Sequence, residues 1–385
     1  MGEPVRDTIH AVTGLSASER VRGFDLATGL AVLFMILVHV LWNWGRPGTS
    51  DTTIGRVISF AAGPTATPTF LFLMGASLGA ARRASIRALV IRGLWLVFLG
   101  YLLNVLRGVI PATLGLATGV ITAEEIAPIT QWSLLTSVDL HHVVGLSLVA
   151  IALLRAYVAP GWIWLAGAAA LGLAAPFVRG FTFGVPLLDA PLTPFIGAAN
   201  NVFYAVVPWL AFPLGGAVLG AAVGRVRDRS ALLRRTALLG AGLLLVGLVL
   251  IVIQQPAFDV YTYWRMPASF LVAIFGIVLV WLWVCDVATR RTWIDQRLGV
   301  VYGWSDRVIA MYFSHWLIVG WGIGLVGYHV LGLEAVLAAM VGAVVVTHFA
   351  SRLVVNLEAV PFLPSPSAAP PSHAAVSVEG AASEA

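Results

Sequence analysis

Long apolar runs, each about as long as a bilayer crossing, constrain this chain more than any other feature. Only 11% of its 385 residues are charged and 59% are hydrophobic, whereas a soluble domain carries about 25% charged residues. A helix that crosses the hydrocarbon core needs about 20 mostly apolar residues. The pattern therefore predicts an all-α, polytopic membrane bundle.

About ten such runs follow one another along the chain. We expect membrane spans at 25–44, 57–81, 88–106, 138–157, 160–177, 201–223, 235–253, 268–286, 307–330 and 334–353. A further apolar stretch at 108–122 suits a re-entrant or surface helix, so the count could differ by one or two. The membrane domain is predicted to cover 20–356, between a polar segment (1–19) and a disordered, Pro/Ser/Ala-rich tail (357–385).

The positions of arginine predict an orientation. Arginine clusters fall on alternate connections, most densely in 224–235 and 289–297. Positively charged loops stay on the cytoplasmic side. Both termini are therefore predicted to be cytoplasmic, and 178–200 and 254–267 to face outward. No short apolar core precedes Arg20, so no cleavable signal peptide is expected, and the chain is predicted to be a multi-pass protein of the cell inner (plasma) membrane.

His39 is the residue most out of place. It is the one ionisable group in "GLAVLFMILVHVLWNWG" (29–45). A neutral imidazole among apolar side chains costs free energy unless both ring nitrogens are satisfied, and ionisable residues inside spans mark functional sites by default. Asp25 and Thr28, 14 and 11 residues earlier, share its helix face, although Asp25 lies about 21 Å away along the axis.

Other polar side chains also fall in or next to predicted spans. They are Asp139, His141 and His142 at the start of the fourth span, Tyr312 and His315 in the ninth, and His348 in the tenth. Each has a structural alternative: a lone histidine can bond a carbonyl of a neighbouring helix, and an aspartate can cap a helix. Adjacent histidines point to different faces, so at least one of the pair is expected at the membrane interface.

Several classes of function do not fit the sequence. The arginines are scattered over loops, which does not favour a nucleic-acid partner. The Asp-Leu-His-His segment lacks metal-protease spacing, so no metal is expected. Cys285 is the only cysteine, which excludes intramolecular disulfides, and we interpret it as a packing residue.

Four segments carry a resemblance to a known family. "RVRGFDLATGLAVLFMILVHV", "PTFLFLMGASLGAARR", "YAVVPWLAFPLGGAVLGAAVG" and "GWSDRVIAMYFSHWLIVG" occur in this order between residues 20 and 320. Together they resemble the heparan-alpha-glucosaminide N-acetyltransferase catalytic-domain family and related bacterial transmembrane acyltransferases (the acyltransferase family 3 superfamily). The order of the motifs is more specific than any one of them.

The resemblance implies transfer of an acyl group, normally acetyl, from cytoplasmic acyl-CoA to a carbohydrate or glycolipid acceptor across the bilayer. His39 would then act as a general base or as a nucleophile that forms an acyl-histidine, and the sequence does not choose between them. Tyr312 and His315 would line the acyl path. Asp139 with His141 or His142 would orient groups at its outer mouth, so the first, fourth and ninth spans are expected to pack together.

One departure keeps other functions open. Thr28 stands where related enzymes carry an arginine, and threonine cannot pair with a phosphate as arginine does. The chain could therefore be an inactive relative. A transporter or flippase with an intramembrane His/Asp proton relay is the other alternative, although the sequence lacks the two similar halves that transporters often show. The oligomeric state is left open.

Overall fold

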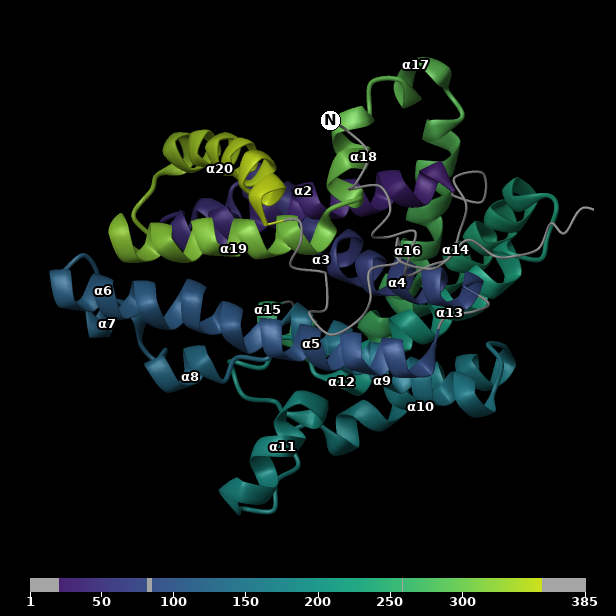
Figure 1. The fold of residues 1–385 in the computed structure, drawn as a ribbon, viewed down its shortest axis with the longest axis horizontal. Coiled ribbons are helices and arrows are strands. Elements are labelled where there is room, and N and C mark those ends of the chain that lie inside the picture. The colour runs from purple at the N-terminus through teal and green to yellow at the C-terminus, as the bar shows by residue number, and fades with distance from the viewer. Residues whose placement is uncertain (1–20, 82–84, 258, 355–385) are drawn as a thin grey trace, which may run out of the picture.

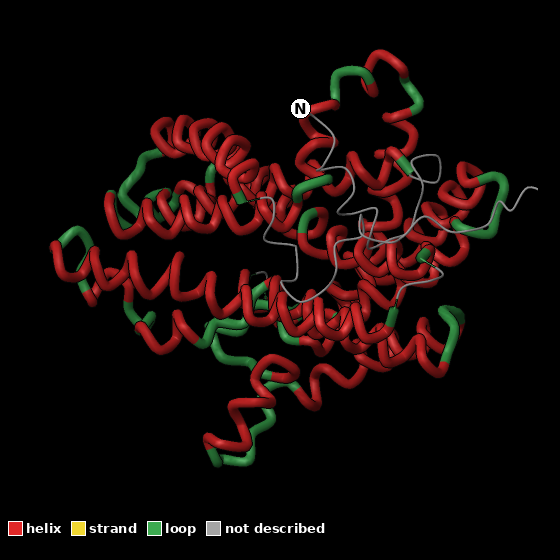
Figure 2. Tube along the Cα trace, viewed as in Figure 1, coloured by secondary structure: helices red, strands yellow, loops and turns green. Residues whose placement is uncertain are grey.

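The computed structural model describes residues 21–81, 85–257 and 259–354. This part of the chain is helical, with short connections and two isolated β-bridges but no strands (Figure 2). The expected polar segment 1–19 and the tail 357–385 lie outside it.

Nine helical stretches in the described residues are long and apolar enough to cross a membrane, so this is a multi-pass helical membrane protein. They are α2 (Arg22–Trp44), α3 and α4 (Thr53–Thr65, Thr67–Ala80), α5 to α6 (Ile86–Asn104, Ile110–Thr118), α9 (Leu140–Tyr157), α12 and α13 (Val206–Trp209, Ala211–Val223), α14 (Arg229–Gln254), α16 (Ala268–Thr289), α19 (Val308–Leu325) and α20 (Leu333–Leu353). The remaining expected span, 160–177, forms the shorter helix α10 (Trp162–Val178).

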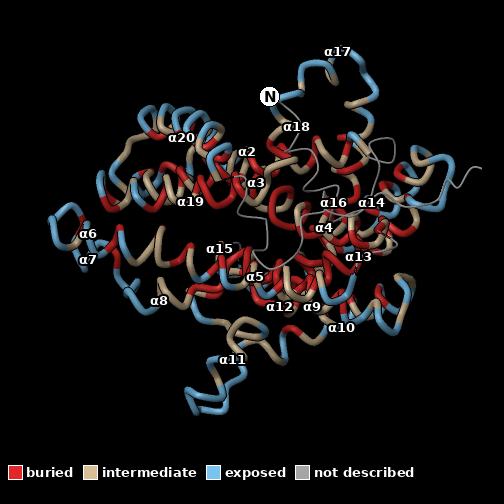
Figure 3. The backbone as a smooth tube through the Cα atoms, viewed as in Figure 1, coloured by how far each residue is buried: buried red, intermediate tan, exposed pale blue. Residues whose placement is uncertain are grey.

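The shorter elements sit in the connections. They are η2 (Thr49–Asp51), α7 (Ala123–Ile126), α8 (Gln131–Leu135), α11 (Pro186–Ile196), α15 (Val260–Arg265), α17 (Thr292–Asp295) and α18 (Gly299–Ser305). Figure 3 shows α11 and α17 as largely exposed arms, whereas buried positions gather where the long helices meet.

The stretch at 108–122 is the main difference from the expected spans. It is not a separate surface helix, because α5 continues through a π-helical segment, η3 (Val105–Val109), into α6. The continuous element runs over Ile86–Thr118. Apolar residues on both sides of Arg107 allow the helix to extend, so the expected end at residue 106 was wrong.

Helix α2 lies at the centre of the arrangement. It packs against α16, α18, α19 and α20 and also contacts α3 and α4 (Figure 1). The other extensive pairs are α14 with α16, α13 with α4, and α5 with α9. In α14 the side chains of Leu238, Leu245 and Val252 are 65–72% exposed, as expected for a helix that presents its outer face to lipid.

Interlocking glycines bring α4 and α13 into backbone contact. A Cβ added at Gly216 or Gly220 would lie 1.8 Å from the carbonyl oxygen of Phe72 or Ala76, and one at Gly79 would lie 1.9 Å from that of Ala217. The small-residue spacing in the sequence therefore marks a true helix-packing seam.

We expect Gly220→Ala to destabilise the protein by about 1–3 kcal/mol, because the added methyl group must push two helix backbones apart. Gly242→Ala in α14 is the matched control, since a Cβ there meets nothing within 4 Å and alanine favours the helix. Thermal unfolding in detergent measures both. A Gly220→Ala protein that melts with the wild type would contradict the seam.

Contacts between the ends of helices agree with the arginine alternation. Arg22 pairs with Asp295, and Arg155 donates to the carbonyls of Leu78 and Ala81. These contacts join segments that the alternation assigns to one side of the membrane. At the opposite ends, Gly45 bridges Leu331 and Val138 bridges Val202.

Which side is cytoplasmic stays a prediction that cysteine labelling tests. In a Cys285→Ala background, Arg227→Cys should resist an impermeant maleimide in intact cells, and Leu187→Cys should react. Both positions are exposed, so reactivity reports sidedness. Labelling at 227 without labelling at 187 would reverse the orientation.

Candidate active site

His39 and His315 form a pair between α2 and α19. Nδ1 of His39 lies 3.0 Å from Nε2 of His315, and the ring centres are 5.2 Å apart in a stacked arrangement. His315 is fully buried and His39 is half-buried. The structure thus brings together two residues that are 276 positions apart in the sequence.

The hydrogen bonds of the pair fix the proton on each ring. Nδ1 of His315 lies 3.2 Å from the carbonyl oxygen of Met311, which can only accept, so this nitrogen carries the proton. Nε2 of neutral His315 must then accept, and Nδ1 of His39 donates to it. Nε2 of His39 is left with its lone pair, and no described residue forms a hydrogen bond with it. A neutral imidazole in this state can take up a proton.

A buried ion pair lies beside the histidines. Nη2 of Arg107 is 2.6 Å from Oδ2 of Asp139, and each side chain is only 8% exposed. The same Nη2 donates a hydrogen bond to Oδ1 of Asn104 at 3.2 Å. The guanidinium carbon lies 4.0 Å from the centre of the Trp316 ring, and the His39 ring centre lies 4.1 Å from that same ring. One indole therefore contacts both the ion pair and the histidine pair.

Local backbone features of two helices place Arg107 there. Arg107 is inside the π segment η3, and such segments often occur at functional sites because an extra residue re-aims the side chains. On α19, a Cβ at Gly320 would lie 1.9 Å from the carbonyl oxygen of Arg107. Gly320 and Trp316 are one helical turn apart, so this close approach presses the indole against the guanidinium group.

Asp139 begins α9 and has two roles. Its Oδ1 accepts from the backbone N–H of Leu140 at 2.7 Å, and its own N–H donates to Nδ1 of His142 at 3.1 Å. It is the N-cap of the helix, as one interpretation of the sequence held. The same carboxylate neutralises Arg107.

Both adjacent histidines are buried, so the expectation that one would face the membrane interface was wrong. His141 is 5% exposed and His142 is 0% exposed, because α9 is covered on two sides. His142 packs edge-on to Tyr101 of α5 with ring centres 4.4 Å apart. His141 packs edge-on to Tyr312 of α19 at 4.7 Å.

An apolar pocket adjoins this cluster. Its empty volume, including the space open to solvent, is about 470 Å³. Its lining includes Thr28, Val32 and Met35 from successive turns of α2, together with His141 and Tyr312. Because Tyr312 is 5.2 Å from His315, ring centre to ring centre, the pocket reaches the surroundings of the histidine pair.

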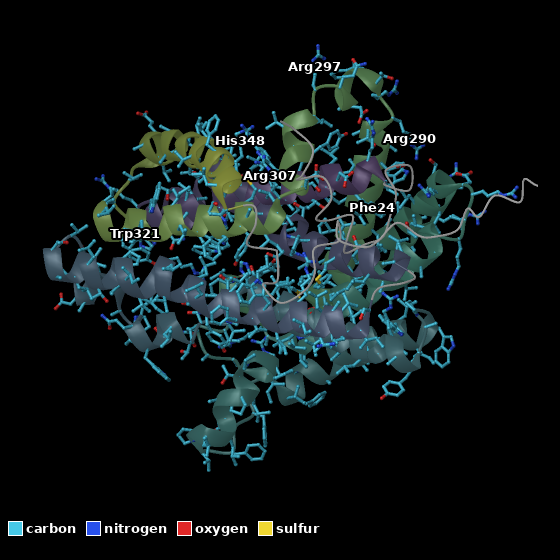
Figure 4. All side chains as sticks on the ribbon, in the orientation of Figure 1. Phe24, Arg290, Arg297, Arg307, Trp321 and His348 are labelled. Carbon is cyan, nitrogen blue, oxygen red and sulfur yellow. The ribbon has the colours of Figure 1, made fainter. Side chains whose placement is uncertain are left out.

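Thr28, Asp25 and His348 lie away from the pair. Thr28 lines the pocket, but its hydroxyl donates to the carbonyl of Phe24 at 3.0 Å. Asp25 is in the first turn of α2, about 21 Å of helix from His39. His348 accepts from Nε1 of Trp304 at 2.9 Å, which is a structural role, and Figure 4 shows it near the C-terminal end of α20.

Sequence reasoning missed Arg107, Asn104 and Trp316. The predicted third span stopped at residue 106, which placed Arg107 in a loop. The sequence does contain a signal: Arg107 is one arginine inside an otherwise apolar stretch, three residues after an asparagine. A charge inside a membrane span marks a functional site by default.

The fold and the site together define the class of protein. A multi-pass helical bundle that holds an interior histidine with a free lone pair is suited to acid–base chemistry inside a membrane protein. The family model for heparan-alpha-glucosaminide N-acetyltransferase, catalytic, matches residues 20–256, and the chain belongs to this family. No curated protein and no solved structure matches it.

The matched region includes His39, Arg107 and Asp139 but ends before α16. The late Tyr-x-x-His segment of α19 therefore lies beyond the match. Its place in the site rests on the contacts of His315 and Trp316 with His39.

Proposed function

We propose that this protein transfers an acetyl group from acetyl-CoA on the cytoplasmic side to a hydroxyl or amine of a carbohydrate or glycolipid on the other side, with His39 as general base. The observation that carries the proposal is Nε2 of His39, which has no hydrogen-bond partner among the described residues and keeps its lone pair because Nδ1 bonds to His315. Family membership supplies the kind of reaction.

The arrangement suits deprotonation of an acceptor. An alcohol or amine attacks a thioester faster when a positioned base removes its proton, an effect of about 10²–10⁴-fold. The bond from His39 to His315 orients the imidazole, as the third group does in other base-activated sites. The same lone pair could attack the thioester directly, so an acyl-histidine remains the competing route and is tested below.

The apolar pocket suits the acyl end of the donor. It extends along α2 from Thr28 to Met35 and is also lined by His141 and Tyr312. Thr28 does not need to contact a phosphate in this proposal, because its hydroxyl is already bonded to the backbone. The phosphates of CoA would then be held elsewhere on the cytoplasmic side.

The alternatives give different results in one assay. Purified protein in detergent should release free thiol from acetyl-CoA in the presence of a glucosamine-containing acceptor, and the acetylated acceptor should be detected by mass spectrometry. An inactive relative would bind acetyl-CoA without release. A transporter would release no thiol and would move solute in proteoliposomes.

A further inference from the structure

One N–H group of the buried guanidinium is not used by the fold. Nη2 of Arg107 forms the ion pair with Asp139 and donates a hydrogen bond to Asn104. Nη1 of Arg107 is buried and has no hydrogen-bond partner in the described part of the chain. The Arg107 side chain is only 8% exposed. A buried donor without a hydrogen-bond partner costs free energy. Nε2 of His141, which packs against Tyr312 in the same cluster, is also buried without a partner among the described residues.

The surroundings favour an acceptor that carries little charge before reaction. Asp139 already neutralises Arg107, and Trp316 covers the guanidinium group. A second full anion would leave net negative charge in a buried site, which is costly. A carbonyl oxygen that becomes negative only during the reaction needs one fixed N–H in a water-poor site, which is the arrangement that stabilises oxyanions.

We propose that Nη1 of Arg107 donates to the thioester carbonyl oxygen of the donor and stabilises the oxyanion that forms on it. This inference rests on the proposed acetyl transfer. Arg107 and His39 contact the same indole ring, so an acyl carbon held against Trp316 can face the base on one side and direct its oxygen at the guanidinium group on the other.

The step balances without a further reactant. His39 Nε2 takes the proton of the acceptor hydroxyl while the acceptor oxygen forms a bond to the carbonyl carbon, and the carbonyl π electrons move to the oxygen beside Arg107. When the tetrahedral intermediate collapses, the carbon–sulfur bond breaks. The CoA thiolate receives the proton from His39, which leaves an acetyl ester, free CoA thiol and neutral histidine.

The test compares wild type with Arg107→Lys on two donors. Lysine keeps the charge that pairs with Asp139 but lacks the second arm of the fork. We expect kcat with acetyl-CoA to fall by about 10²–10³-fold, the usual cost of losing an oxyanion donor, with KM for acetyl-CoA changed less than about threefold. Arg179→Lys is the matched control, because Arg179 is a partly buried arginine whose Nε and Nη2 also have no hydrogen-bond partner among the described residues, and it lies outside the site.

A donor whose carbonyl oxygen is replaced by sulfur separates contact from packing. Sulfur accepts hydrogen bonds weakly, so wild type should turn over dithioacetyl-CoA much more slowly than acetyl-CoA, and Arg107→Lys should lose most of that discrimination. If Arg107→Lys does not fold, Arg107→Met with Asp139→Leu replaces the pair by apolar groups and the same comparison is made.

The outcomes are distinct. A wild type that transfers nothing would overturn the proposed function itself. An active wild type with unchanged kcat in folded Arg107→Lys, or equal turnover of the two donors by wild type, would overturn the role of Arg107 alone.

Discussion

His39→Gln is expected to lower acetyl transfer by about 10²–10⁴-fold while the protein stays folded and binds acetyl-CoA. The new amide can still donate to Nε2 of His315, the partner that lies 3.0 Å from the present ring, so the packing between α2 and α19 is retained. An amide cannot take up a proton at neutral pH. Turnover per folded molecule, measured beside the melting temperature, is the deciding quantity.

His348→Gln is the matched control. It removes another histidine from a membrane helix, but one that bonds to Trp304 and Arg352 rather than lying in the site. We expect it to alter stability and to leave turnover per folded molecule near the wild-type value. A His39→Gln protein with the turnover of His348→Gln would remove His39 from the chemistry.

The same variant separates the two routes. If His39 forms an acyl-histidine, acetyl-CoA labelled in the acetyl group should mark the wild type during turnover and should not mark His39→Gln. Direct transfer leaves the wild type unlabelled. In either case the lone pair on Nε2 is the reacting group, because Nδ1 is held by His315.

Sequence reasoning succeeded where a physical constraint acts locally. The apolar runs predicted the membrane helices because backbone groups must be satisfied inside each span. Gly216 and Gly220, which share a helix face because they are four residues apart, form the packing seam between α13 and α4. His39 was singled out because an imidazole in an apolar run needs a partner.

The site was only half predictable because its partners come from distant segments. His315 was named as a candidate, but nothing in the sequence links it to His39 rather than to a backbone carbonyl. Arg107 was missed because the third span was expected to end at residue 106, just before this charge. The ion pair with Asp139 lowers the free-energy cost of burying the Arg107 guanidinium group. That compensation exists only after α5 and α9 have packed together.

Asp139→Asn is expected to destabilise the protein by about 3–5 kcal/mol, the range for a buried ion pair that loses one partner. The new amide keeps the shape of the side chain and can still cap α9, where Oδ1 now accepts from Leu140. It cannot neutralise Arg107, whose side chain is 8% exposed. The loss therefore reports the uncompensated charge and not the cap.

Asp228→Asn is the matched control for the cap, since Asp228 accepts from the N–H of Ala231 at 2.8 Å at the exposed start of α14. Asparagine and aspartate cap about equally well, so a change within about 0.5 kcal/mol is expected. Unfolding by SDS titration in mixed micelles gives the free energies of unfolding.

Adding Arg107→Gln to Asp139→Asn should recover much of the loss of stability, because a neutral amide pair removes the buried charge and leaves two groups that can form hydrogen bonds with each other. Equal unfolding midpoints for Asp139→Asn and Asp228→Asn would mean that water reaches Arg107. That result would contradict the water-poor site on which the proposed stabilisation of an oxyanion by Arg107 depends.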